Sequence, residues 1–264
     1  MKQSELNRIL DQHKLWLESN GNQGKRADLS GADLTDADLT DANLHCADLS
    51  GADLSAADLF NADLFDVNLR GANLSGANLS GVYLSGVYLS GANISDANLS
   101  GANLYCTNLR GADLRDANLI DSNLTGADLN YANLRDAYLS DANLSGANLS
   151  NAILDAADLT SADLIGAHLT SADLIDANLR DAYLNGAYLS GANLTRAYLS
   201  GADLRGANLN GATLYRANLT GANLSDSILN SKHMSKAKVD QSQLSWLATD
   251  PNFCDWMNKL IIYD

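Results

Sequence analysis

The residue types that most often carry catalysis are few in this sequence and lie far apart. Its four histidines are His13, His45, His168 and His233, and its three cysteines are Cys46, Cys106 and Cys254. None of the histidines has a serine, cysteine or acidic partner in the arrangement of a catalytic triad. The cysteines are too few and too scattered for a disulfide framework or a metal site. We therefore expect no catalytic residues, no metal site, no cofactor and no enzymatic activity.

Aspartate is far more abundant, and it is concentrated near the N-terminus. Residues 27–69 hold ten aspartates and no lysine or arginine. One interpretation is an acidic patch that binds a basic protein partner or divalent cations, and the other is a solvated face that keeps the chain soluble. The residues of this predicted acidic patch are Asp28, Asp33, Asp36, Asp38, Asp41, Asp48, Asp53, Asp58, Asp63 and Asp66.

Aromatic side chains interrupt the polar positions further along the chain. Tyr183 and Tyr188 lie near His168 in the sequence, and a surface of this kind could anchor a partner. The alternative is that these are separate surface aromatics, each stacked on its own neighbours. The residues of this predicted aromatic patch are Tyr83, Tyr88, His168, Tyr183 and Tyr188.

A five-residue repeat positions all of these side chains. From Leu29 to Leu229 every fifth residue is leucine, except for Ile94. The residue two before the leucine is nearly always alanine, and the residue just before it is aspartate or asparagine in 31 repeats. Of the 20 glycines, 18 occupy the second position after the leucine. Such regularity predicts one stacked architecture instead of a conventional globular core.

A period of five does not fit the regular elements. On an α-helix five residues advance by about 500°, which spreads the leucines around the helix, and on a straight strand alternate leucines face opposite ways. The leucines share one side only if the chain turns in every repeat. Glycine at the second position after leucine predicts a type II turn, which needs a positive φ. We expect a different turn where glycine is replaced, at Asp36, Asp41, Ser161 and Arg216.

The tandem Ala-(Asp/Asn)-Leu-X-X motif over residues 27–229 resembles the pentapeptide-repeat protein family. The resemblance implies an all-β fold, a right-handed quadrilateral parallel β-helix with four repeats in each coil. Coincidences at multiples of twenty residues agree with it, such as Tyr83 with Tyr183 and Tyr138 with Tyr198. The array would then have about ten coils and a length of about 49 Å. Cys46 and Cys106 would share a column about 14 Å apart, too far for a disulfide.

Both ends of an open stack need caps, because they expose strand edges. We expect residues 1–25 to form a capping helix and linker, residues 26–240 the β-helix, and residues 241–264 a helical cap. Ser4 is the expected N-cap of the first helix, which stops at Asn20-Gly21. The apolar residues of that helix are Leu6, Ile9, Leu10, Trp16 and Leu17.

The C-terminal cap is expected to contain two short helices. Asp240 with Gln243 resembles a capping box, and Asp250-Pro251 begins the second helix. The apolar face of that helix protects the edge of the stack, or it forms a dimer interface as the resemblance implies for some relatives. The predicted dimer contacts are Phe253, Trp256, Met257 and Leu260.

Charge and hydropathy disfavour several classes of function. The net charge of −15 and the isoelectric point near 4.4 disfavour direct binding to nucleic acid or anionic lipid. No apolar run approaches the length of a membrane span, and the N-terminus lacks signal-peptide character, so we expect a cytoplasmic, bacterial protein. We expect a non-enzymatic rod-like scaffold or protein-interaction module with an unknown protein partner, as a monomer or as a homodimer through the C-terminal cap.

The resemblance also implies an alternative function. Some members of the family regulate gyrase, a type II topoisomerase, by imitating duplex DNA. Duplex DNA carries one negative charge about every 1.7 Å, and only the first two coils of this array reach that density. The array also has no phenylalanine at the central position and no inserted loop. The sequence therefore favours the scaffold over the DNA mimic.

Overall fold

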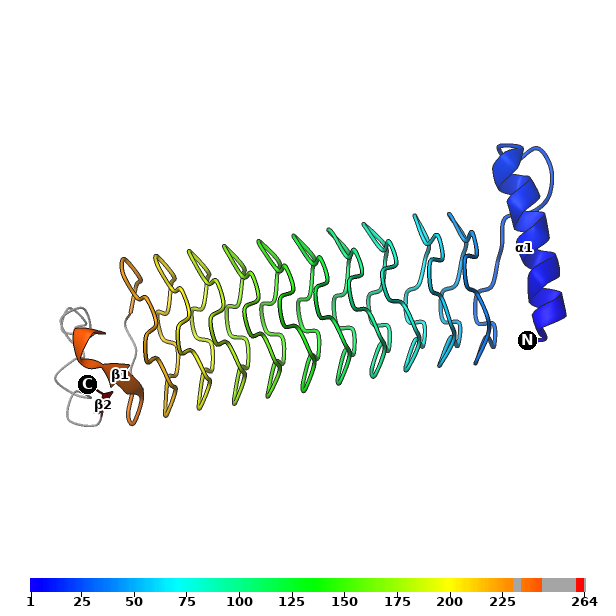
Figure 1. Ribbon diagram of the computed structural model, residues 1–264. Coiled ribbons are helices and arrows are strands. Elements are labelled where there is room, and N and C mark those ends of the chain that lie inside the picture. Colours follow the sequence, from blue (N-terminus) through cyan, green and yellow to red (C-terminus); the bar gives the residue numbers. More distant parts are fainter. Residues whose placement is uncertain (230–233, 244–259, 264) are drawn as a thin grey trace.

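Residues 27–229 wind into a long rod of stacked coils, with a helix at one end (Figure 1). The computed structural model describes residues 1–229, 234–243 and 260–263. Parallel bridges join residues twenty positions apart along the array, from Asp28 with Asp48 to Asn218 with Lys238. Twenty residues are four repeats, so each coil has four sides, as the resemblance implied.

Each side of a coil is too short to count as a regular strand. Only the residue before the leucine bridges to the next coil, and the chain then turns a corner. Within the described ranges, two segments pair over several consecutive residues and form regular strands. They are β1, Lys238–Asp240, and β2, Ile261–Tyr263. The rod is nevertheless built as a β-helix, because backbone hydrogen bonds of the parallel kind hold its coils together.

Backbone N–H groups follow the same hydrogen-bonding pattern in most repeats. The N–H of Leu109 donates to the Asp128 carbonyl in the next coil at 2.8 Å. At the corner, the N–H of Gly111 donates to the Asn130 carbonyl at 3.0 Å, and the N–H of Ala112 closes the turn on Leu109 at 3.0 Å. Buried backbone groups need such partners, so the stacking of coils and the shape of the corners depend on each other.

The aspartate or asparagine before the leucine completes this pattern with its side chain. In Asp53, Oδ1 accepts the N–H of Ser55 at 3.0 Å. The same oxygen accepts a hydrogen bond from Asn73 Nδ2 in the next coil at 2.9 Å. These residues are therefore part of the corner structure, in addition to being the polar surface of the rod.

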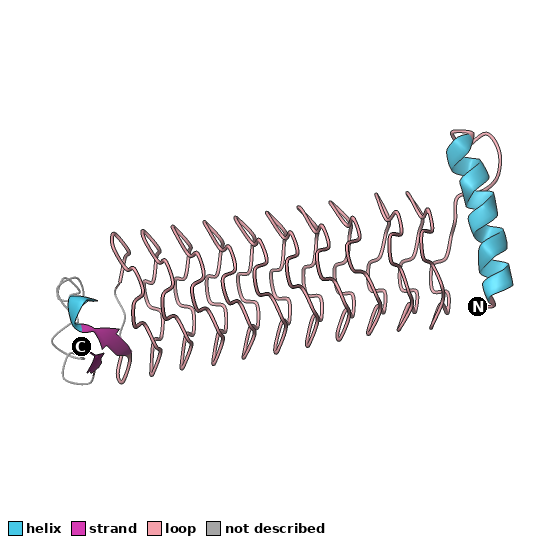
Figure 2. Ribbon diagram, in the orientation of Figure 1, coloured by secondary structure: helices cyan, strands magenta, loops and turns pink. Residues whose placement is uncertain are grey.

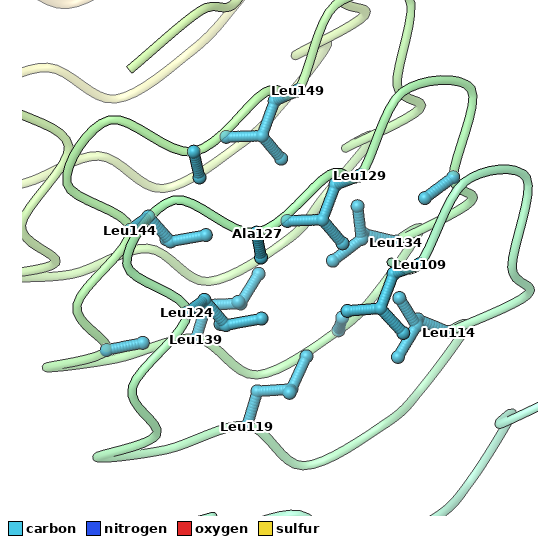
Figure 3. Packing of buried hydrophobic residues seen from close by; sticks show 14 of the residues in the cluster. Leu109, Leu114, Leu119, Leu124, Ala127, Leu129, Leu134, Leu139, Leu144 and Leu149 are labelled. Carbon is cyan, nitrogen blue, oxygen red and sulfur yellow. The ribbon is translucent and has the colours of Figure 1, made fainter. Parts of the chain in front are cut away.

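Leucine and alanine fill the interior of the rod, where the leucines of successive sides point toward one another (Figure 3). The array leucines are all buried, as are nearly all the alanines. Two polar residues at alanine positions, Thr107 and Ser122, are also buried. Their hydroxyls donate to the carbonyls of Leu84 and Leu119, each at 2.6 Å, so the core tolerates them.

The corners keep one conformation whether or not they contain glycine. In residues 31–226 the second residue after every leucine has a positive φ. The φ angles of Asp36, Asp41, Ser161 and Arg216 are 54°, 55°, 57° and 60°. The prediction of a different turn at these four corners is therefore wrong. The N–H of such a residue must reach the next coil, as Ser161 does to the Arg180 carbonyl at 2.9 Å. Stacking thus outweighs the roughly 1–2 kcal/mol cost of a left-handed non-glycine residue.

Helix α1, Gln3–Glu18, lies across the N-terminal end of the rod (Figure 2). Asp38 lies in the first coil, so no preceding coil can bond to its backbone, and the Gln3 side chain makes these hydrogen bonds instead. Gln3 Nε2 donates to the Asp38 carbonyl at 2.9 Å, and Gln3 Oε1 accepts the Asp38 N–H at 3.3 Å. Deeper in the interface, buried His13 Nδ1 accepts the N–H of Ala27 at 3.1 Å. The helix therefore protects the open edge of the first coil.

The two boundaries of α1 differ in how well the sequence predicted them. The residue before the helix is Lys2, which makes no side-chain cap, so the prediction of Ser4 as the N-cap is wrong. Docking of Gln3 on the rod fixes the start instead. The helix ends at Glu18 with Ser19 as its C-cap, just before the predicted stop at Asn20-Gly21, where both residues have positive φ angles. A Cβ at Gly24 would lie 2.1 Å from the Gln12 carbonyl oxygen, so the returning linker requires glycine there.

At the other end of the rod, β1 continues one side of the coil and pairs in parallel with β2. A short 3-10 helix, η1, Gln241–Gln243, follows β1. The N–H of Asp240 donates to Gln243 Oε1 at 2.8 Å, as in one half of a capping box. Of the predicted dimer contacts, Leu260 is partly buried against the core. Phe253, Trp256 and Met257 lie outside the described residues.

Candidate interaction surfaces

The ten aspartates of the predicted acidic patch form a belt around the first coils. Bridges place Asp28 above Asp48, Asp33 above Asp53, and Asp38 above Asp58, on three different sides. Asp63 lies on the fourth side, below Asn43. Asp36, Asp41 and Asp66 occupy corners with positive φ. A ligand that approaches from one direction meets only part of this belt, so the ten carboxylates do not converge on one site.

Hydrogen bonds inside the repeats favour the ionised form of several of these carboxyl groups. The serine hydroxyl two positions later, and then its N–H, lower the pKa of Asp28, Asp48 and Asp53 from the ordinary value. At Asp33 and Asp38 the N–H of the threonine two positions later is the main cause of a lowered pKa. In these five carboxylates, one oxygen is thus already engaged with the chain's own donors, which favours the charged form.

The structure divides the predicted aromatic patch. His168 and Tyr188 lie in adjacent coils with stacked rings, whose centroids are 4.6 Å apart. Tyr88 lies on the same side of the rod but four bridges away from His168, a distance of about 19 Å. The Arg70 guanidinium lies over its ring, 4.3 Å from the centroid. His168 and Tyr188 are therefore the pair that the structure brings together.

The remaining two predicted tyrosines lie on the neighbouring side of the rod. Tyr83 bridges Asp63 and Asn103, whereas Tyr183 bridges Asp163 and Asp203. Five coils separate them, about 24 Å along the rod axis. They therefore belong to two different surfaces.

A different set of aromatic residues crosses four consecutive coils near the N-terminus. We call it the aromatic run, and it consists of His45, Phe65, Tyr83 and Tyr105. The N–H groups of Phe65 and Tyr105 donate to Asp63 and Asn103, the two residues that bridge to Tyr83. The rings of His45 and Phe65 are stacked, with centroids 5.1 Å apart. Phe65, Tyr83 and Tyr105 are 49%, 69% and 50% exposed.

Sequence reasoning missed the aromatic run because the predicted patch grouped only the aromatics that replace aspartate or asparagine, and Phe65 was noted without being aligned with His45 and Tyr105. Three members of the run follow a leucine instead. The signal was present, since His45, Phe65 and Tyr105 are separated by multiples of twenty residues. In a four-sided coil that spacing stacks side chains in one column.

A cluster of metal-ligating side chains lies at the beginning of the aromatic run. His45, Cys46 and Asp66 offer a nitrogen, a sulfur and an oxygen atom that all lie within 4.8 Å of one another. Burial, followed by the charge of Asp66, raises the pKa of the Cys46 thiol. The cluster borders a hollow that is also lined by the end of α1, at Trp16, Leu17, Asn20 and Gly21. The expectation of no metal site was based on the spacing of the cysteines. It did not consider that Asp66, twenty residues after Cys46, lies beside it in the next coil.

Two carboxyl groups meet further along the rod. Burial, and then the charge of Asp155, raises the pKa of Asp173. An oxygen of each carboxyl, Oδ1, is buried without a hydrogen-bond partner in the described chain. Arg135 pairs with the other oxygen of Asp155 at 2.6 Å. Arg135 therefore forms an ion pair with one member of a pair of carboxylates that repel each other.

None of the helices in the described ranges is long and apolar enough to span a membrane.

Stacked four-sided coils with flat polar walls define a class of protein, the quadrilateral β-helical repeat proteins. A sequence model of pentapeptide repeats matches the chain in 8 copies, over residues 25–61, 62–101, 83–119, 92–130, 117–155, 132–170, 152–191 and 192–230. The chain belongs to the pentapeptide-repeat family, whose members fold as right-handed quadrilateral β-helices with a helix near the N-terminus.

Solved structures of the family resemble this chain. HetL, a pentapeptide repeat protein involved in heterocyst differentiation regulation in the cyanobacterium Nostoc, is 39% identical, with 80% of this chain and 92% of HetL covered and a TM-score of 0.44. QnrB1, a plasmid-mediated fluoroquinolone resistance protein, is 23% identical over 85% of this chain and 96% of its own, with a TM-score of 0.42. A pentapeptide repeat protein from the Arabidopsis thaliana thylakoid lumen is 37% identical over 42% of this chain and 71% of its own, with a TM-score of 0.27. No curated protein sequence matches the chain.

Proposed function

We propose that this chain is a non-enzymatic scaffold that binds a protein partner through the aromatic run. Pentapeptide-repeat proteins are generally structural or interaction modules. The observation that carries the proposal is the presence of four aromatic side chains on four consecutive coils, three of them about half exposed or more. Large aromatic side chains dominate the energetics of protein interfaces, especially when they lie together.

The rigidity of the rod supports this use of the surface. Two of the rings project from residues whose carbonyls accept a hydrogen bond from the preceding coil: the N–H of Cys46 donates to the Phe65 carbonyl at 2.9 Å, and the N–H of Gly86 donates to the Tyr105 carbonyl at 3.0 Å. A partner therefore does not have to order a flexible loop when it binds. Less conformational entropy is lost, which favours affinity for a given contact area.

The charge beside the aromatic run indicates the kind of partner. Asp63 and Asp66 flank Phe65, and the acidic belt continues from them around the rod. We expect the partner to present apolar or aromatic side chains with lysine or arginine at the rim. Arginine and lysine would meet both the carboxylates and the ring faces.

Affinity capture with matched baits tests the proposal. One bait carries Phe65→Ser, Tyr83→Asn and Tyr105→Ser, which install the residues that the array normally uses at these positions. The control bait carries Tyr183→Asn and Tyr198→Asn. The first bait should lose a partner that both the wild type and the control retain. Recovery of the same partners by all three baits would rule out the aromatic run as the binding surface.

The acidic belt can be tested separately. A bait with Asp33→Asn, Asp38→Asn, Asp53→Asn and Asp58→Asn keeps the Oδ1 that accepts the N–H two positions later but removes four charges. If the belt steers a basic partner, association should slow and lose its dependence on salt. Unchanged association would identify the belt as a solvated surface.

A gyrase supercoiling assay separates the scaffold from the alternative, a DNA-mimicking regulator of a type II topoisomerase. The scaffold proposal expects neither inhibition nor protection of gyrase at micromolar concentrations of the chain. The belt supports the same expectation, because its charges surround the rod at one end instead of following one wall.

The proposal includes the dimensions and setting of the scaffold. We take the array to have about ten coils and a length of about 49 Å. Free Cys46 and Cys106 suit a reducing bacterial cytoplasm.

For the homodimer through the C-terminal cap, light scattering should show a halved mass after deletion of residues 250–264, and an unchanged mass would contradict it.

A further inference from the structure

The cluster of His45, Cys46 and Asp66 combines three different donor atoms at the junction of two coils. Cys46 and Asp66 occupy successive corners of one edge of the rod, twenty residues apart, and His45 directly precedes Cys46. One donor atom from each side chain lies within 4.8 Å of the other two. The leucine core and the corner hydrogen bonds do not require this combination of side chains.

The supporting backbone holds these ligands in place. Cys46 and Asp66 have φ angles of 63° and 56°, the same conformation as the other corners of the array. The N–H of Cys46 donates to the Phe65 carbonyl at 2.9 Å, and this bond ties the first coil to the second. The imidazole of His45 is stacked on the Phe65 ring. A site built on a rigid framework requires little rearrangement when a ligand binds.

The set of donor atoms selects the class of ligand. Thiolate, imidazole and carboxylate are the three side-chain ligands of zinc, at bond lengths of about 2.0–2.3 Å. Ligands around a tetrahedral ion are then about 3.6 Å apart, so shifts of roughly an ångström would bring the present donors onto one ion. Calcium and magnesium prefer oxygen ligands alone and do not suit the thiol.

We propose that His45, Cys46 and Asp66 bind one transition-metal ion of the zinc class, with water as the fourth ligand. The hollow beside His45 and Cys46 leaves room for the water next to the end of α1. The ion would join the first two coils at the start of the aromatic run. The proposal stands whether or not the aromatic run binds a partner.

Cobalt(II) titration of the untagged full-length chain tests the proposal, because a thiolate–cobalt bond produces a charge-transfer absorption band. We expect one ion per chain, displaced by zinc. Cys46→Ser should abolish the band, and serine already occupies equivalent corners at Ser161 and Ser171, so the fold should persist. Asp66→Asn and His45→Phe should each weaken binding by more than about tenfold, as loss of a ligand should cost at least as much as loss of its support.

The chain provides its own control three coils further along the same edge. Cys106 occupies the corner that corresponds to Cys46, but Tyr105 stands in place of His45 and Gly126 in place of Asp66. Cys106→Ser should leave the band unchanged. The proposal fails if no band forms at millimolar cobalt or if the band survives Cys46→Ser. It also fails if the band depends on Cys106 instead, or if changing His45 and Asp66 has no effect on affinity.

Discussion

The asparagine or aspartate before each leucine faces solvent and still acts as part of the backbone. Asn98 accepts the N–H of Ser100 at 3.2 Å and its hydroxyl at 2.8 Å. Its Oδ1 also accepts a hydrogen bond from Asn118 Nδ2 in the next coil at 3.3 Å. This explains why the repeat favours these two residue types, which the outward orientation alone does not.

Removal of this acceptor should weaken the rod. We expect Asn98→Ala to lower the free energy of unfolding by about 1–2 kcal/mol, because the Ser100 N–H loses its partner. Asn98→Asp keeps the acceptor and should have a smaller effect. Urea denaturation followed by circular dichroism measures both, and equal losses from the two variants would show that the acceptor is not what matters.

The carboxyl pair of Asp155 and Asp173 makes a pH-dependent prediction. Burial and the nearby Asp155 charge raise the pKa of Asp173. A carboxyl group whose pKa is higher in the folded state favours folding while it is protonated, at low pH, and loses that benefit as the pH rises through its folded pKa. At neutral pH its charge is therefore unfavourable.

Asp173→Asn should raise stability near pH 7, by less than about 1 kcal/mol because the site is partly open to solvent. The gain should shrink below about pH 4, where aspartate is protonated in the unfolded chain as well. Thermal unfolding at the two pH values measures it. Asp163→Asn is the control, because Ser145 stands two residues after its bridge partner Asn143, where Asp155 stands two residues after Ile153, the bridge partner of Asp173. A gain at Asp173 that is the same at both pH values would contradict the assignment.

Among the elements, helix α1 supplies the hydrogen bonds that a missing coil would otherwise make. Gln3 pairs with both backbone groups of Asp38, and Leu6 is buried against the core. The sequence predicted a capping helix here from its apolar face. It did not reveal the role of Gln3. A polar residue in the first turn of a helix is common, and the strand edge that Gln3 bonds to exists only in the folded rod.

We expect Gln3→Ala to loosen the helix without unfolding the rod. The loss of two hydrogen bonds should lower the free energy of local opening by roughly 1–2 kcal/mol. Hydrogen exchange should therefore accelerate in α1 and at the Asp38 amide, while the central coils stay protected. Gln12→Ala is the control on the same helix, because only its backbone carbonyl bonds to the linker, at Lys25. Equal acceleration in the two variants would contradict the role of Gln3.

The corners and the sites show where prediction from the sequence stops. The leucine period and the resemblance gave the coil, its core and its four sides. The corner at Arg216 was mispredicted because local preference disfavours a positive φ, whereas stacking imposes it. The aromatic run and the cluster at Cys46 were missed because they bring together residues about twenty positions apart. The proximity of these residues becomes evident only when each residue is aligned with the residues twenty positions before and after it.

At the scale of the whole molecule, the rod places function on its walls and ends. Helix α1 closes one end, β1 and β2 lie at the other, and the core between them is filled by leucine and alanine (Figure 1). The aromatic run, the acidic belt and the cluster at Cys46 all lie in the coils nearest α1. The N-terminal end is therefore where we expect partners and metal to bind.

All of these placements depend on a coil of twenty residues, and cross-linking measures that number directly. In a chain whose native cysteines are replaced by serine, Ser75→Cys is combined with Ser90→Cys, Ser95→Cys or Ser100→Cys. Four-sided coils put residues 75 and 95 about 4.8 Å apart, within the range for a disulfide. We predict that only the pair twenty residues apart forms an intrachain disulfide readily. Preferential cross-linking of the pair fifteen or twenty-five residues apart would indicate three or five sides and contradict the account.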